Sequence, residues 1–189
     1  MIVMDDKLKI ASHNSCSGEP CGNLISYLVI PFARCQSKTI DEQITFGVRM
    51  FDLRAKKVNG HYYPAHGCFR NKIPVEEYIK KINSCEDDVY ATITYEGSLK
   101  NDDELNNFKS WISYIKDTYT HIHWGDICIK KPWTTIIKAD PGFASSVSKF
   151  KHLDGSSWHT YLPIPWLWDK IYSRPHEFDN KQFTYYDFV

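Results

Sequence analysis

The sequence predicts an α/β fold in which β/α units build a mainly parallel sheet, and three observations lead there. Short apolar runs alternate with helix-like segments up to about residue 100, a pattern typical of β/α units. The chain has 189 residues, of which 42% are hydrophobic and 15% aromatic, and this suffices for one sizeable core. No internal repeat or low-complexity tract divides the sequence. We therefore expect a single domain over residues 1–189.

Apolar runs and turn signals define the elements of the N-terminal half. Gly47 follows a helix-like run, and glycine in that position commonly ends a helix. The pair Asn59-Gly60 marks a tight, hairpin-like connection. The expected elements are strands at Leu8–Ala11, Val48–Leu53 and Tyr62–Ala65 and helices at Ile40–Phe46 and Pro74–Ile82.

The second half begins with the two clearest elements and then loses its pattern. Val89–Tyr95 is rich in β-branched residues and predicts a strand, and Asp102–Tyr119 predicts a helix with acids in its first turn. Residues 140–180 are rich in Gly, Ser, Pro and Trp and have no helical period. Further strands are expected at Ile122–Ile129, Trp133–Ala139 and Phe183–Val189.

Charge and hydropathy argue against bulk binding to nucleic acid and against a membrane-spanning segment. The chain carries 23 basic and 23 acidic residues, so no bulk electrostatic attraction to nucleic acid is expected. A phosphate-bearing partner would have to be held by a local site. The longest apolar run, Leu24–Ala33, is interrupted by Ser26 and Pro31 and falls short of the roughly 18 residues of a membrane span.

The N-terminus and the cysteines bear on the compartment. Met1–Ile10 places two acids and two lysines where a secretory signal has a basic start and an apolar run of about 7–15 residues. The six cysteines are sparse and form no C-x2-C pair, which favours reduced thiols and a cytoplasmic protein. A start at Met1 that replaces a removed signal would instead suit secretion and disulfides, and the sequence leaves this alternative open.

Polar and ionisable residues stand at the ends of five predicted strands. They are His13 with Asn14, Asp52 with Arg54, His66, Glu96 and Asp187. In a parallel barrel the C-terminal strand ends converge on one mouth, so such residues can meet. Two imidazoles and a guanidinium suit phosphoryl transfer, as base, acid and charge neutraliser. Each histidine could equally be a capping residue, and Asp52 and Arg54 a structural ion pair.

Three segments resemble the catalytic region of phosphatidylinositol-specific phospholipase C, especially its bacterial form. They are Ile10–Ser15, Cys35–Arg54, which contains Gly-Val-Arg-x-Phe-Asp-x-Arg, and Tyr63–Gly67. The resemblance spans residues 8–69, extends to the strand ending in Glu96 and returns at Tyr186–Val189, which is similar to the last barrel strand of the family. It implies a TIM (β/α) barrel. Such barrels rarely have fewer than about 200 residues, so we expect a compact, incomplete barrel with helices reduced in its C-terminal half.

The resemblance also implies roles for the strand-end residues. His13 would be the general base, oriented by Asp187, and His66 the general acid. Arg54 matches the arginine that replaces calcium in the bacterial enzymes, and Asp52 matches a neighbouring active-site carboxylate. The implied reaction is attack by the inositol 2-hydroxyl on its own phosphodiester, which releases diacylglycerol and leaves a cyclic inositol phosphate.

Asn14 departs from the bacterial pattern, which has aspartate there. Asn14, Asp52 and Glu96 match three calcium-ligand positions of the eukaryotic enzymes. The fourth position is Arg54, whose charge would repel a cation. We therefore expect no cofactor rather than calcium, with Asn14 and Glu96 as substrate-binding residues.

Two other functions stay open at this stage. One is a metal-dependent glycerophosphodiesterase or sphingomyelinase D-like enzyme, which Arg54 disfavours because those families have a carboxylate cluster there. The other is a binding or structural module that keeps the barrel with weak or no catalysis, which Asn14 favours.

Outside the strand ends, four segments have a functional and a structural interpretation. The aromatic run Trp158–Trp168 suits either an interfacial rim or a packed loop, and the loop is favoured because the run has no basic residue. The expected partner is an inositol phospholipid or phosphodiester, with peripheral membrane contact.

His121-Ile-His123 lacks a third metal ligand and is interpreted as structural. Lys130-Lys131 and Lys56-Lys57 are interpreted as surface charge.

Overall fold

The computed structural model describes residues 10–141, 143 and 183–186. Its strands are β1 (Ile10–Ser12), β2 (Val48–Val58), β3 (His61–His66), β4 (Phe69–Arg70), β5 (Val89–Tyr95), β6 (Ile122–Ile129), β7 (Thr134–Ile137) and β8 (Thr184–Tyr186). Its helices are the 3-10 turn η1 (Ser15–Gly18), α1 (Leu24–Ala33), α2 (Ile40–Phe46), α3 (Val75–Asn83) and α4 (Asp102–Thr118).

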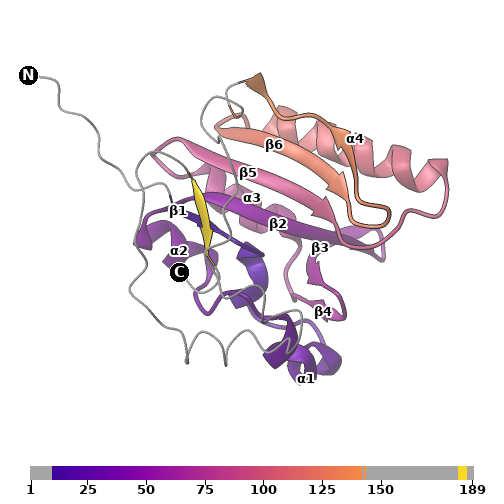
Figure 1. Ribbon diagram of the computed structural model, residues 1–189, viewed down its shortest axis with the longest axis horizontal. Coiled ribbons are helices and arrows are strands. Elements are labelled where there is room, and N and C mark those ends of the chain that lie inside the picture. Colours follow the sequence, from indigo (N-terminus) through magenta and orange to yellow (C-terminus); the bar gives the residue numbers. More distant parts are fainter. Residues whose placement is uncertain (1–9, 142, 144–182, 187–189) are drawn as a thin grey trace, which may run out of the picture.

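All eight strands belong to one mixed sheet (Figure 1). Its parallel part runs in the order β8-β1-β2-β5-β6. The hairpin of β3 and β4 continues antiparallel from the C-terminal end of β2, and β7 pairs antiparallel with β6. The predicted α/β fold is confirmed, whereas the sheet is mixed.

The sheet does not close into a barrel. Within residues 10–141 and 183–186, no ladder joins β7 to β8. Only the turn of residues 130–133 separates β6 from β7, whereas a parallel neighbour needs a crossover of about a dozen residues or more. At this point the chain therefore makes a hairpin in place of a further β/α unit. Between Ile122 and Ile137 a hairpin stands where a helix was expected to be lost, and most of the remaining segment to residue 180 lies outside the described residues.

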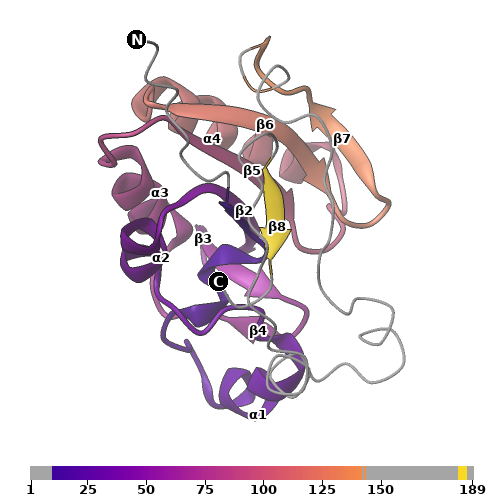
Figure 2. The same cartoon turned by 60° about the vertical axis from the view of Figure 1, so that its left-hand side comes forward.

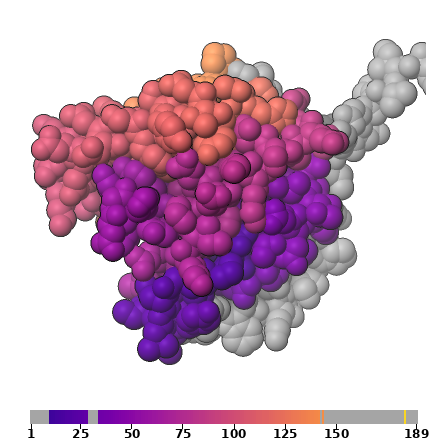
Figure 3. Space-filling model, turned by 180° about the vertical axis from the view of Figure 1, so that it is seen from behind, coloured from indigo at the N-terminus to yellow at the C-terminus, as the bar shows by residue number. Residues whose placement is uncertain are grey.

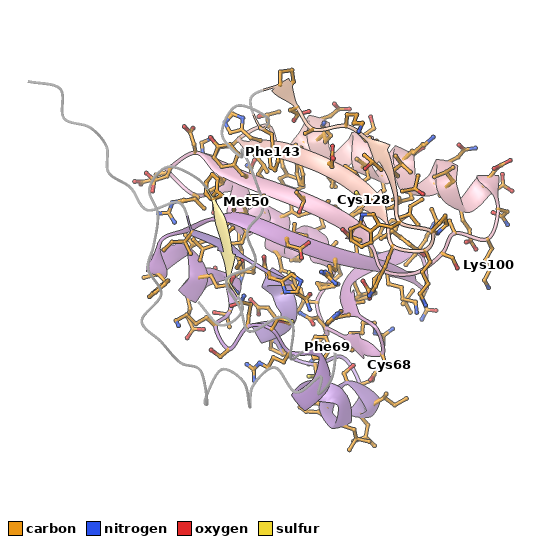
Figure 4. All side chains as sticks on the ribbon, in the orientation of Figure 1. Met50, Cys68, Phe69, Lys100, Cys128 and Phe143 are labelled. Carbon is orange, nitrogen blue, oxygen red and sulfur yellow. The ribbon has the colours of Figure 1, made fainter. Side chains whose placement is uncertain are left out.

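The two faces of the sheet have different covers. Helices α2, α3 and α4 lie on one side (Figures 2 and 3), where they bury a large cluster that includes Phe51, Leu53 and Ile93. The opposite face carries a smaller cluster of Ala11, Met50, Phe143 and Phe183, two of whose members are labelled in Figure 4. Because side chains alternate along a strand, Asp52 and Arg54 share the face of Met50.

Local sequence signals explain why the predicted elements begin and end where they do. Thr39 Oγ1 accepts a hydrogen bond from Glu42 N at 3.3 Å while Glu42 Oε2 accepts one from Thr39 N at 2.7 Å, which caps α2 at its start. Gly47, at φ 105°, ends it. Asn59 and Gly60 both have positive φ, as a two-residue turn between β2 and β3 requires. The predicted helix at 40–46 and the predicted turn are confirmed.

Helix α1 is an element that the sequence did not predict. Pro31 lies near its C-terminal end and concealed it, because proline removes a backbone donor from a helix. None of the helices among the described residues is long and apolar enough to cross a membrane. The aromatic run Trp158–Trp168 lies outside the described residues.

Candidate active site

Neighbouring strands bring four of the predicted site residues to one end of the sheet. His13 follows β1, and Ser12 pairs with Phe51 of β2, so His13 is placed beside Asp52. Arg54 lies two residues further along β2, on the same face as Asp52. Glu96 follows β5, whose Tyr95 pairs with Ala55. The parallel register therefore sets the C-terminal ends of β1 and β5 beside the middle of β2, where Asp52 and Arg54 lie.

His13, Arg54 and Asp52 are in direct contact. Arg54 Nη2 lies 2.7 Å from His13 Nε2, and Arg54 Nε donates to Asp52 Oδ2 at 3.2 Å. The same carboxylate oxygen lies 3.7 Å from His13 Nε2. A guanidinium has donors only, so His13 Nε2 accepts and the imidazole carries its proton on Nδ1 in this arrangement. This contact requires a neutral His13 imidazole whose Nε2 atom is a hydrogen-bond acceptor beside Arg54 and Asp52.

Asp52 is buried and ionised. Burial alone would raise its pKa, but Arg54 and the backbone N–H of Asn14 hold the pKa of this carboxyl below its ordinary value. Asn14 N donates to Asp52 Oδ2 at 3.1 Å. Asn14 itself has φ 47° and ψ 53°, a left-handed conformation that asparagine tolerates better than most residues. Its backbone therefore supports Asp52.

Glu96 is held by three groups of the chain. Its Oε1 accepts hydrogen bonds from Lys130 Nζ and from Gly67 N, the latter at 3.0 Å. Its Oε2 lies 4.0 Å from Arg54 Nη1. Burial would raise the pKa of Glu96, but Lys130, Gly67 and Arg54 lower it below its ordinary value. Lys130 is thus a site residue, and its interpretation as surface charge was wrong.

His66 ends β3, and its backbone lies beside Glu96. The peptide that joins it to Gly67 carries the N–H bonded to Glu96, which brings the His66 backbone to the carboxylate. The fifth predicted residue, Asp187, lies outside the described residues, although Tyr186 before it pairs with Ser12 of β1.

The donor set does not fit calcium, which takes about 6–8 oxygen ligands. Asp52 and Glu96 both face the Arg54 guanidinium, and Glu96 also faces Lys130. The Nδ2 atom of Asn14 lies 3.9 Å from Cys35 Sγ. Among the residues that the structure describes, no cluster of three His, Cys, Asp or Glu side chains is arranged to hold a metal. Chain cations take the positions beside the carboxylates that a metal ion would need.

Lys130 was the site residue that sequence reasoning missed. Its one signal is position, because it directly follows β6 just as Glu96 directly follows β5. Its backbone N–H donates to the carbonyl of Tyr95 at 3.0 Å, which sets the two residues side by side. Only the strand pairing reveals this.

The fold resembles that of phosphatidylinositol-specific phospholipase C from Listeria monocytogenes. The two structures align with a TM-score of 0.60 at 13% sequence identity, over 97% of this chain and 89% of that one. A phosphatidylinositol-specific phospholipase C from Staphylococcus aureus aligns over 66% of this chain and 52% of that one, at 17% identity and a TM-score of 0.45. No protein-family model and no curated protein matches the sequence. The predicted resemblance is confirmed as a likeness of fold.

Proposed function

We propose that this protein is a phosphodiesterase that cleaves an inositol phospholipid by acid/base catalysis, as a phosphatidylinositol-specific phospholipase C does. The observation that carries the proposal is the contact of Arg54 with His13 beside Asp52 at the strand ends. In-line attack by a hydroxyl on a phosphodiester needs an acceptor imidazole next to a guanidinium that can donate two hydrogen bonds to the phosphate.

The reaction begins with an exchange of partners at Arg54. Its guanidinium turns from His13 Nε2 to the phosphate oxygens, which leaves the Nε2 lone pair to take the proton of the inositol 2-hydroxyl. The 2-oxygen forms a bond to phosphorus as the bond to the diacylglycerol oxygen breaks. His66 supplies the proton that this leaving oxygen needs. The products are diacylglycerol and a cyclic inositol phosphate, with the proton balance carried by the two imidazoles.

The charges of the candidate site support the role of His66 as the group that supplies the proton. Arg54 and Lys130 offset Asp52 and Glu96, so the four groups together are neutral. A bound phosphodiester adds one negative charge to a largely buried site. A protonated His66 restores neutrality and is the form that an acid needs.

Helix α1 supports a lipid substrate. Four large apolar side chains on it, Leu24, Ile25, Tyr27 and Leu28, are 59–74% exposed, and the helix contains no charged residue. It packs on β4, which follows His66 and Gly67 closely, and the labels of Cys68 and Phe69 in Figure 4 mark this neighbourhood. An exposed apolar patch next to a reaction site suits contact with a bilayer surface. We infer that α1 brings the mouth to the membrane.

A catalytically silent inositol phosphate-binding module is the second candidate. It is favoured by one observation, the hydrogen bond that already engages His13 Nε2. Binding of inositol phosphate without turnover would identify it. The test of the main proposal is release of cyclic inositol phosphate from phosphatidylinositol vesicles, which His13→Ala and His66→Ala should each abolish in a folded protein.

A further inference from the structure

Two hydrogen-bond donors from distant parts of the chain meet on one oxygen of Glu96. Lys130 Nζ comes from the end of β6, and Gly67 N comes from the turn after β3. We propose that Lys130 is a positioning residue that acts through Glu96 on the peptide following His66. This inference rests on the proposed function, in which His66 supplies the proton to the leaving oxygen.

The contacts from Lys130 through Glu96 to Gly67 form a relay, and backbone hydrogen bonds to the sheet hold Glu96 and Lys130 in place. Glu96 N donates to Ala55 O of β2 at 2.7 Å, and Lys130 N donates to Tyr95 O of β5 at 3.0 Å. The side chain of Glu96 is 3% exposed, so its carboxylate has little water to exchange partners with. The Lys130 side chain is 30% exposed, so the ion pair is partly shielded from solvent. The acceptor position is therefore fixed by backbone bonds on two strands.

The Gly67 end lies in the two-residue turn of the β3–β4 hairpin, in which His66 pairs with Phe69. Gly67 has φ +60°, a left-handed conformation, and no other group lies within 4 Å of the place where its Cβ would be. Among the described residues, the β3–β4 pairing fixes the two ends of this turn, and the bond to Glu96 fixes the peptide inside it. Its N–H belongs to the peptide whose rotation sets the ψ angle of His66. The bond to Glu96 at 3.0 Å therefore orients the backbone that carries the proposed acid.

Lys130 keeps the Glu96 carboxylate in the position where it also accepts the hydrogen bond from Gly67 N. A buried carboxylate needs compensation, and Lys130 provides the contact that lets Glu96 stay ionised with Gly67 bound. Without Lys130, Glu96 would still face Arg54, whose Nη1 lies 4.0 Å from Oε2. Glu96 would turn toward Arg54, release the Gly67 peptide and draw Arg54 away from Asp52. Loss of Lys130 should thus affect turnover more than ground-state binding.

The test compares Lys130→Met with Lys130→Arg and with the matched control Lys131→Met. Lys131 is the exposed neighbour, which no side-chain hydrogen bond or ion pair ties to Glu96 in the described residues. We expect Lys130→Met to lower kcat at least about tenfold while KM changes less than about threefold. Lys130→Arg, which keeps the charge and the donors, should restore most of kcat. Lys131→Met should behave as the wild type.

A second readout does not need activity. In wild-type protein the Gly67 amide proton should show the downfield shift and slowed exchange of a charge-assisted hydrogen bond. Lys130→Met and Glu96→Gln should move that resonance upfield and speed its exchange. An unchanged Gly67 amide in Lys130→Met, or a kcat equal to that of Lys131→Met in an active enzyme, would overturn the inference. A wild-type protein without turnover would instead defeat the proposed function, and the Gly67 amide would still decide the relay.

Discussion

Arg54 Nη2 and His13 Nε2 lie 2.7 Å apart, and this contact joins the residue that can bind a phosphate to the residue that can accept a proton. His13 directly follows β1, whereas Arg54 lies in β2, and the two are 41 residues apart in the chain. Asp52 completes the set from the same face of β2. The proposed function depends on Arg54 exchanging His13 for phosphate.

Replacing Arg54 with lysine should therefore impair catalysis more than the retained charge suggests. Lysine cannot offer two parallel donors to a phosphate, so we expect kcat/KM to fall about 100-fold. The matched control is Arg49→Lys on the same strand, because Arg49 pairs with Asp87 at 2.7 Å and is not part of the site. Steady-state kinetics on both variants checks the prediction. Equal activity in the two variants would contradict it.

Asp52 should contribute stability that disappears in acid. Its pKa is lowered in the folded state, so its contribution is present above the ordinary value of about 3.9 and is lost as pH falls through the folded value. At pH 7, Asp52→Asn should reduce the free energy of unfolding by about 3 kcal/mol, because a buried ion pair loses one partner. Denaturant unfolding from pH 7 to pH 3 should show the gap to wild type narrowing below about pH 4.

The control for this measurement is Asp88→Asn, since the Asp88 side chain is 78% exposed. That variant should stay close to wild type at every pH. A gap for Asp52→Asn that stayed constant down to pH 3 would argue against the charge pairing.

Helix α1 should govern action on lipid surfaces. Leu24→Glu or Leu28→Glu should weaken binding to phosphatidylinositol vesicles about tenfold each, because an apolar side chain is replaced by a charge. Phe46→Glu on α2 is a suitable control, as Phe46 is 45% exposed and α2 packs on β2 and α3, whereas α1 packs on β4. Vesicle sedimentation measures binding, and activity on a short-chain soluble substrate should fall much less. Equal losses on both substrates would contradict a membrane role.

A strong chelator should leave activity unchanged within about twofold, because chain cations already compensate both carboxylates. Calorimetric titration with calcium should give the same result for wild type, Asp52→Asn and Glu96→Gln. Activity that chelation abolishes and calcium restores would overturn the charge argument at Arg54.

Much of this architecture was accessible from the sequence because it is encoded locally. Gly47 and the Asn59-Gly60 pair fix a helix end and a turn by their backbone conformations, and both were predicted. The proximity of His13, Asp52 and Arg54 follows from the parallel register, which sets the end of β1 beside Phe51 of β2.

Other features depend on contacts between distant segments. The turn of residues 130–133 makes β7 antiparallel to β6. Whether the sheet then closes depends on how β7 lies relative to the other strands, which the local sequence does not encode. Lys130 resembles any surface lysine until β6 pairs with β5 and sets it beside Glu96. Helix α1 lacks the polar face of an ordinary surface helix, so periodicity could not find it.

The central claim is tested most directly by phosphorus NMR of phosphatidylinositol vesicles incubated with wild-type protein, His13→Ala, His66→Ala and the control His61→Ala. His61 is an exposed residue at the start of the strand that ends in His66. We predict a cyclic inositol phosphate from wild type and His61→Ala, and a rate lower by about 1,000-fold or more in the other two variants, each folded by circular dichroism. Cyclic product formed at the wild-type rate by either His13→Ala or His66→Ala would contradict the account.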